Sequence, residues 1–364
     1  MHRIHRPDMV LLGTILALLG IGFIMVYSSS AVRGYIQYDD PYHYLKMELI
    51  WVLLGLGAMF LCMRLNLRLV RRFALPALYV AIALLVAVKI PGIGRKVNGA
   101  DRWIGLGPLS IQPSEVIKLS MVLVMSHVLA LDPHKILSFR KGVLPILGLL
   151  GVIAGLIMLQ PDLGTTLVIA ATTFFLLIAA GARVGHILGL AGTGLGLVVA
   201  AIAAAPYRMR RILAFLDPWA DPLGNGYQTI QALLALGPGG LFGLGLGQSR
   251  QKFLYLPENH TDFIFAMIGE ELGFVGASLV VLLFFLFAWR GFRVAMRAPD
   301  VFTGFLAVGL TAMVSIQAMI NMGVVSGVLP VTGITLPFIS YGGTSLVFTM
   351  IGVGVLLNIS REVR

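Results

Sequence analysis

The chain has 364 residues, of which 58% are hydrophobic and only 12% are charged. A water-soluble domain of this length needs far more charge to cover its surface, so the composition excludes that class and predicts a polytopic membrane protein. The formal net charge of +11 is explained by the membrane topology derived below, and it does not indicate binding to nucleic acid. The one cysteine, Cys62, excludes an internal disulfide.

Spans of about 20 apolar residues cross a bilayer as helices. We therefore predict an all-α integral membrane protein, a single polytopic membrane domain over residues 1–364. The first apolar run is too long for the core of a signal peptide, so we expect it to be retained. The ten predicted transmembrane helices cover residues 10–32, 47–63, 73–90, 115–131, 142–159, 164–181, 184–205, 262–289, 302–325 and 342–359.

Charge in the loops predicts the orientation of these spans. An even number of spans places both termini on one side, which would carry fifteen basic and four acidic residues, the whole net charge of +11. The positive-inside rule makes that side cytoplasmic. Two long segments, about 90–114 and 206–261, are then extracytoplasmic, and the second is a large loop between helices 7 and 8. Long loops in compact proteins tend to carry function.

The first of these segments leads into the fourth span. Arg102 and Trp103 could bind a sugar or lipid headgroup, or Arg102 could belong to a surface pair and Trp103 could be an interfacial anchor. Glu115 lies in the first turn of the next helix, and Lys118 lies three residues later on the same face, where the two can pair. A structural ion pair and a direct catalytic role both remain open.

Two further groups of charged residues precede the eighth span. Asp162 follows the fifth span in QPDLGTT and could cap the next helix or belong to a site. A set of cations on the large loop could snorkel to lipid phosphates, or their charge could hold a pyrophosphate. These cations are Arg208, Arg210, Arg211 and Lys252.

Asp262 stands where the large loop meets the eighth apolar run. A carboxylate at the edge of a bilayer is expensive to keep ionised, which favours a functional role, although Asp262 could also be a helix N-cap. His260 has no second histidine at metal-ligand spacing, so we expect a hydrogen-bonding role and no protein-built metal site. The broken apolar stretch 330–344, with two prolines and a Gly-Gly pair, should be buried or line a cavity, and we expect it to border the same site.

The amino-acid sequence of several segments resembles that of the SEDS family (shape, elongation, division and sporulation), whose members include FtsW, RodA and SpoVE. The matching segments are NGADRWIGLGPLSIQPSEVIKL at 98–119, QPDLGTT at 160–166, residues 217–273 and NMGVVSGVLPVTGITLPFISYGGTSL at 321–346. Together they span nearly the whole chain in the family's order. GLGQSRQKFLYLPE at 245–258 and LPFISYGGTSL look more like the FtsW/SpoVE branch.

This resemblance implies a ten-helix peptidoglycan glycosyltransferase of the bacterial cytoplasmic (inner) membrane, multi-pass, with both termini cytoplasmic and its active site on the outer face. It implies lipid II as the substrate and a class B penicillin-binding protein, a transpeptidase, as the partner. The family's essential aspartate falls on Asp262. Its fourth-helix acid and lysine fall on Glu115 and Lys118, and its QPDLGT aspartate falls on Asp162.

Lipid II polymerisation joins a sugar 4-hydroxyl to an anomeric carbon and expels undecaprenyl pyrophosphate. We expect Asp262 to be the general base. The loop cations, alone or with a divalent cation such as Mg²⁺ or Mn²⁺, would hold the pyrophosphate. The alternatives are a lipid II flippase and a structural subunit that recruits the transpeptidase. The acids gather at the outer edge of the bilayer and not through its depth, which favours the enzyme.

Overall fold

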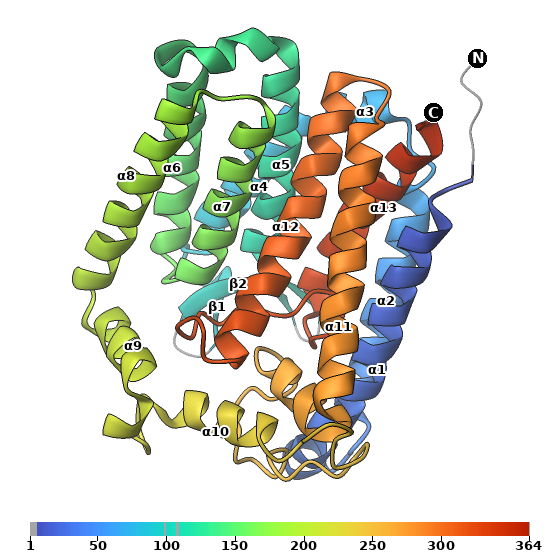
Figure 1. Cartoon of the computed structure of the whole chain (residues 1–364), viewed down its shortest axis with the longest axis vertical. Coiled ribbons are helices and arrows are strands. Elements are labelled where there is room, and N and C mark those ends of the chain that lie inside the picture. Colours follow the sequence, from blue (N-terminus) through green and yellow to red (C-terminus); the bar gives the residue numbers. More distant parts are fainter. Residues whose placement is uncertain (1–5, 98–99, 107–108, 364) are drawn as a thin grey trace.

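The computed structural model describes residues 6–97, 100–106 and 109–363 and is a bundle of mostly long helices (Figure 1). The helices that match the predicted spans are α1 (Met9–Tyr38), α2 (His43–Cys62), α4 (Ala74–Ala87), α5 (Pro113–Leu131), α6 (Leu144–Met158), α7 (Leu163–Ala179), α8 (Val184–Ala203), α11 (Ile264–Met296), α12 (Val301–Val325) and α13 (Gly343–Glu362). Shorter helices are α3 (Leu67–Arg72), α9 (Pro206–Leu216), α10 (Tyr227–Leu236), η1 (Pro133–Leu137), η2 (Phe139–Val143) and η3 (Pro218–Ala220).

Each predicted span overlaps one of the long apolar helices. Among the described residues, eight helices are long and apolar enough to cross a membrane, counting η2 and α6 as one run from Phe139 to Met158. The other two, α4 and α7, are apolar but have only 14 and 17 residues. The structure therefore confirms a mostly helical membrane protein.

The two ends of the bundle differ. At one end, here called the terminal end, the start of α1 meets the end of α13, where the Asp8 backbone N–H donates to Ser360 Oγ at 3.0 Å. Asp8 also pairs with Arg290 of α11. The opposite end, here called the loop end, carries the sheet, α9, α10 and the long loop before α11 (Figure 1).

The loop end contains two pieces of structure that sequence analysis did not predict. The segment 90–114 forms a three-stranded antiparallel sheet of β1 (Gly94–Val97), β2 (Ala100–Leu106) and β3 (Leu109–Ile111), in that order. The sequence predicted a long, patterned extracytoplasmic segment here and did not predict its strands. The segment 206–261, also predicted as loop, includes α9 and α10.

The centre of the bundle is formed by α5, α12 and α13, most of whose residues are buried. The α13 helix packs closely along α2, and α12 packs against α5, α7 and α11. The α8 helix lies at the outside and buries none of its residues in the chain. A polar group on α5 or α12 is therefore enclosed by protein and must find its partners there.

The loop before α11 is tied to α11 by two buried acids. Glu270 accepts hydrogen bonds from Ser249 Oγ and from the Arg250 backbone N–H, at 2.5 and 2.9 Å. Glu271 accepts from Ser28 Oγ of α1 at 2.6 Å and from the Gly247 backbone N–H at 3.0 Å. These contacts explain how α11 holds two adjacent carboxylates that are buried in the protein, and they fix the loop that leads to Asp262.

Just after these acids, α11 is broken at Gly273, which has φ of 69° and ψ of −165°. The break frees the Glu270 and Glu271 carbonyls to accept from the Leu244 and Gly245 backbone N–H groups, at 2.9 and 3.0 Å. A Cβ atom on Gly273 would lie 2.3 Å from the Gly243 backbone nitrogen. Both the backbone angles and the available space therefore require glycine at this position.

Candidate active site

A cavity of about 450 Å³ lies at the loop end. Its walls come from segments far apart in the chain: the end of α1, the start of α2, the sheet, the starts of α5 and α7, the turn before α11, the middle of α12, and the segment 333–345. The stretch 330–344 was predicted to border the same site as Asp262, and the structure confirms it. Of the predicted site residues, the lining includes Arg102, Glu115, Lys118, Asp162, His260 and Asp262.

Asp262 reaches the cavity from the turn that precedes α11. Its backbone carbonyl accepts a hydrogen bond from Asn321 Nδ2 at 2.7 Å, and the same Nδ2 donates to the Ile334 carbonyl at 2.6 Å. The neighbouring Thr261 carbonyl accepts from Ser340 Oγ at 2.6 Å. The backbone at Asp262 is thus held by α12 and by the broken segment, while the side chain is left for the cavity.

The Asp262 carboxylate is not an N-cap. The N-cap of α11 is Phe263, and no described residue donates a hydrogen bond to the Asp262 side chain. Its Oδ2 lies near Gly333, 3.6 Å from where a Cβ would stand. Burial raises the pKa of Asp262 to about 7, with further increases from the charges of Glu258 and Asp162. Arg211 and Arg102 act in the opposite direction and lower this pKa.

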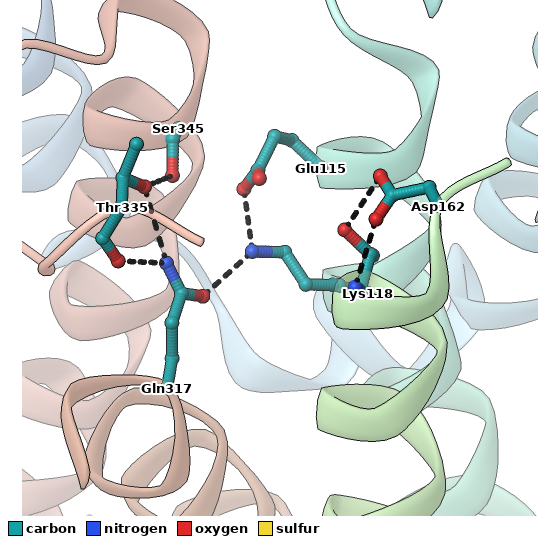
Figure 2. Close-up of polar contacts among 7 residues, drawn as sticks. Glu115, Lys118, Asp162, Gln317, Thr335 and Ser345 are labelled. Atoms are coloured by element: carbon teal, nitrogen blue, oxygen red, sulfur yellow. Dashed lines mark hydrogen bonds and ion pairs between the residues drawn. The ribbon is translucent and has the colours of Figure 1, made fainter. Parts of the chain in front are cut away.

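Glu115 and Lys118 form the predicted ion pair inside the bundle (Figure 2). Lys118 Nζ lies 2.8 Å from Glu115 Oε2 and donates to Gln317 Oε1 at 2.7 Å. Gln317 Nε2 in turn donates to the Thr335 carbonyl at 3.0 Å. Both charged side chains are less than a tenth exposed. The pair therefore joins α5 to α12 and to the broken segment, at the floor of the cavity.

Asp162 caps α7, which is one of the two roles considered for it. Its Oδ1 accepts from the Thr165 backbone N–H at 3.0 Å, and its Oδ2 accepts from Thr165 Oγ1 at 2.9 Å. Arg102 is held beside this turn, because its Nε donates to the Gln160 carbonyl at 2.9 Å and its Nη2 donates to the Pro161 carbonyl at 2.6 Å. Arg102 thus enters the cavity from the sheet with a fixed position.

His260 is buried among aromatic rings. Its ring centre lies 4.8 Å from that of Tyr44 and 5.7 Å from that of Tyr341, and its Nδ1 is 3.2 Å from Asn259 Oδ1. Burial, together with the charge of Arg33, lowers the pKa of His260 to about 3. The imidazole is therefore neutral at physiological pH. It packs in the wall of the cavity, which the sequence did not predict, and its contact with Asn259 agrees with the predicted hydrogen-bonding role.

The cations of the large loop lie away from the cavity lining. Arg208 donates to the Ala201 carbonyl at 2.8 Å and stacks on Tyr207. Arg211 donates to the Val331 carbonyl at 3.3 Å, and Lys252 donates to the Gly247 carbonyl. None of these three, nor Arg210, is among the described residues that line the cavity. Of the group, the charge of Arg211 still acts on Asp262.

Sequence analysis missed three contributors to the site. Arg33, near the end of α1, lines the cavity and lies 3.8 Å from Glu258. Gln317 and Asn321 stand one turn apart on α12, where they contact Lys118 and the Asp262 carbonyl. Two amides at i and i+4 in an otherwise apolar helix were a usable signal, because such groups avoid lipid.

Fold and site together define a polytopic membrane protein with a charged, partly enclosed cavity at one end of its bundle. A family model described as cell cycle protein, covering FtsW, RodA and SpoVE, matches residues 9–364. The chain belongs to this family.

Three similar proteins illustrate the match. Stage V sporulation protein E of Bacillus subtilis (strain 168) is 50% identical over 358 residues, covering 98% of each chain. A probable peptidoglycan glycosyltransferase FtsW of Trichlorobacter lovleyi is 44% identical over 100% of this chain and 95% of its own. One solved structure matches with a TM-score of 0.81 and 34% identity, and the match covers 98% of each chain. Its description is "Structural coordination of polymerization and crosslinking by a peptidoglycan synthase complex". The SpoVE and FtsW matches agree with the predicted branch.

Proposed function

We propose that this chain is a peptidoglycan glycosyltransferase that polymerises lipid II, using Asp262 as its general base. The relatives named as glycosyltransferases match over nearly their whole length, which supports the reaction class. The observation that carries the assignment of the base is the Asp262 carboxylate, which faces the cavity with no hydrogen-bond donor among the described residues. A carboxylate left without donors keeps its lone pairs available for a substrate proton.

The reaction would run in the cavity as a single displacement. The 4-hydroxyl of the acceptor lipid II attacks the anomeric carbon of the donor glycan and loses its proton to Asp262. The new glycosidic bond forms while the bond from the anomeric carbon to the phosphate oxygen breaks, and the pyrophosphate takes the electron pair. A pKa of about 7 suits this proton transfer, because a base works best when its pKa is near the working pH.

The leaving pyrophosphate needs positive charge. Arg33 and Arg102 are the cavity-lining arginines, so they take over the role first considered for Arg208, Arg210, Arg211 and Lys252. Guanidinium groups match phosphate oxygens in a two-pronged geometry.

A divalent cation could assist at the same place. Among the described residues, no group of three His, Cys, Asp or Glu could hold a metal ion. The carboxylates of Asp262 and Glu258 both line the cavity. If Mg²⁺ or Mn²⁺ takes part, Glu258 would be the carboxylate that holds it, because Asp262 is needed to accept the substrate proton. Such an ion would offset the charge of the pyrophosphate.

The topology that fits this function has ten spans, both termini in the cytoplasm and the loop end on the outer face, all within one membrane domain. The partner would be a class B penicillin-binding protein, the transpeptidase that cross-links the new glycan. The similar solved structure comes from a peptidoglycan synthase complex that couples polymerization to crosslinking, which supports such a partner.

The test uses the full-length chain with its transpeptidase partner and lipid II in detergent, with glycan chains resolved on gels. We expect Asp262→Asn to lose at least about a hundredfold in rate, the lower range for a positioned base. Asp221→Asn is the matched control, because Asp221 is exposed on the same loop, its carboxylate accepts from the Asn225 backbone and side chain, and it is not among the described residues that line the cavity. A folded Asp262→Asn protein with wild-type polymerisation would rule out the base. A flippase would make no glycan in detergent.

A further inference from the structure

A second charged cavity, of about 590 Å³, lies at the terminal end of the bundle, far from Asp262. It is bounded by the end of α2, by α3, by the turn between α11 and α12, and by the end of α13. It shares no lining residue with the cavity at the loop end. Its charged lining residues are Arg64, Arg68, Arg71, Arg361, Asp300 and Glu362.

Among the described residues, the lining of this cavity carries more positive than negative charge, with four arginines and two acids. No ion pair joins any of the four arginines to an acid among the described residues. Asp300 is already engaged, because its Oδ1 accepts the Phe302 and Thr303 backbone N–H groups at 2.9 and 3.1 Å as the cap of α12. The cavity therefore presents guanidinium groups in excess over free carboxylates.

Two of the four arginines are fixed and two are free to reach a ligand. Arg361 donates to the Met63 carbonyl at 2.6 Å, and Arg71 lies over the Phe302 ring at 5.4 Å. Arg64, in the α2–α3 turn, and Arg68, in the first turn of α3, are both exposed. Two held arginines beside two exposed ones can together surround a phosphate, whose oxygens the guanidinium forks match.

An apolar cavity of about 370 Å³ adjoins the charged one. The two share Leu65, and the short helix α3 separates them: Arg68 and Arg71 line the charged cavity, while Leu69 and Val70 line the apolar one. The apolar cavity continues into the bundle along Phe73, Ala77, Leu119, Leu123 and Ile351. A ligand that fills both must therefore combine an anion with a hydrocarbon chain.

We propose that the terminal end binds an anionic phospholipid, with its phosphate among Arg64, Arg68, Arg71 and Arg361 and one acyl chain in the apolar cavity beyond Leu65. The cavity of arginines alone would accept any phosphate. The adjoining apolar space selects a lipid, and the surrounding bilayer supplies one. This site is independent of glycan polymerisation and lies at the opposite end of the helices.

The experiment measures lipid retention by the full-length protein. The wild type is purified in mild detergent, mixed with phosphatidylglycerol or phosphatidylcholine, and examined by native mass spectrometry. We expect tight retention of phosphatidylglycerol. Arg64→Gln/Arg68→Gln should weaken it by about 10- to 30-fold, the loss expected for two arginines next to an anionic headgroup. Arg140→Gln/Lys141→Gln is the matched control, because these exposed residues of η2 carry the same charge outside the cavity.

A second variant separates a lipid from a soluble phosphate. Ala77→Phe fills the apolar cavity and leaves every arginine in place. This variant should no longer retain phosphatidylglycerol. The wild type should bind glycerol 3-phosphate much more weakly than it binds phosphatidylglycerol. Equal retention of phosphatidylcholine, an equal loss in the Arg140/Lys141 control, or unchanged binding in both cavity variants would overturn the proposal. Tight binding of glycerol 3-phosphate alone would replace the lipid with a soluble anion and overturn it as well.

Discussion

Replacing Lys118 by methionine tests how the protein supports the floor of its cavity. Lys118 Nζ lies 2.8 Å from Glu115 and 2.7 Å from Gln317 Oε1, and its side chain is 5% exposed. Methionine keeps most of the length of lysine and removes its charge, so Glu115 would remain as a buried carboxylate that has lost its cation. Breaking a buried ion pair from one side destabilises a protein by about 3–5 kcal/mol. We expect a loss of this size in the free energy of unfolding.

The double variant Glu115→Gln/Lys118→Met removes both charges. Because a neutral, well-packed pair avoids the desolvation of two ions, it should recover most of the stability lost in Lys118→Met. Lys135→Met is the matched control, since Lys135 pairs with Asp132 at the same i,i+3 spacing and at 3.5 Å, but with both side chains largely exposed. It should change the free energy of unfolding by less than about 1 kcal/mol.

The assay is chemical unfolding in mixed micelles, followed by polymerisation of lipid II with the same preparations. If Lys118→Met is no less stable than Lys135→Met, or if the double variant stays as unstable as the single one, the buried-pair reasoning is refuted. The polymerisation activity of the double variant distinguishes a positioning role of the ion pair from a direct role on substrate. A pair that only positions α5 and α12 should allow the stable double variant to work, whereas a charge that acts on substrate should leave it folded and inactive.

Three further predictions concern single positions. Because burial raises the pKa of Asp262 to about 7, the base is protonated below that value. The polymerisation rate should therefore rise as pH increases through about 7, and a profile already flat above pH 5 would contradict the assignment. Asp162→Ala should lower the free energy of unfolding by about 1 kcal/mol, because it removes the cap of α7. Asp162→Asn should keep most of the stability that the cap provides. If both variants lose polymerisation equally, the substrate needs the carboxylate charge itself. Gly273→Ala should lower the melting temperature in detergent, because its Cβ would lie 2.3 Å from the Gly243 nitrogen, and an unchanged melting temperature would refute the tight contact.

Residues that work through local geometry were predictable from the chain alone. The i,i+3 spacing of Glu115 and Lys118 predicted a pair on one helix face, and the structure shows that pair. The position of Asp162 before an apolar run gave a helix cap as one of two interpretations, and the structure shows the cap. In each case the partner lies within one helical turn, so hydrogen-bond geometry follows from sequence spacing.

Residues that act across the bundle were not predictable in the same way. Arg208, Arg210 and Lys252 have the chemistry for pyrophosphate, yet they are not among the described residues that line the cavity. Arg33 does line it, although nothing near it in sequence marks it. Lys118 and Gln317 are 199 residues apart and meet through a 2.7 Å hydrogen bond. Such contacts depend on which helix faces pack together, and apolar helices offer many alternative pairings.

Hydropathy and loop charge determined the membrane class and the places of the long helices, because a bilayer core excludes charge and unpaired backbone over a set thickness. The sequence motifs indicated the family. The tertiary structure alone decided which polar side chains share a cavity with Asp262, that the segment 90–114 forms a sheet, and that α11 breaks at Gly273 to hold the preceding loop. Those outcomes required contacts between distant segments, whose geometry exists only once the helices have packed.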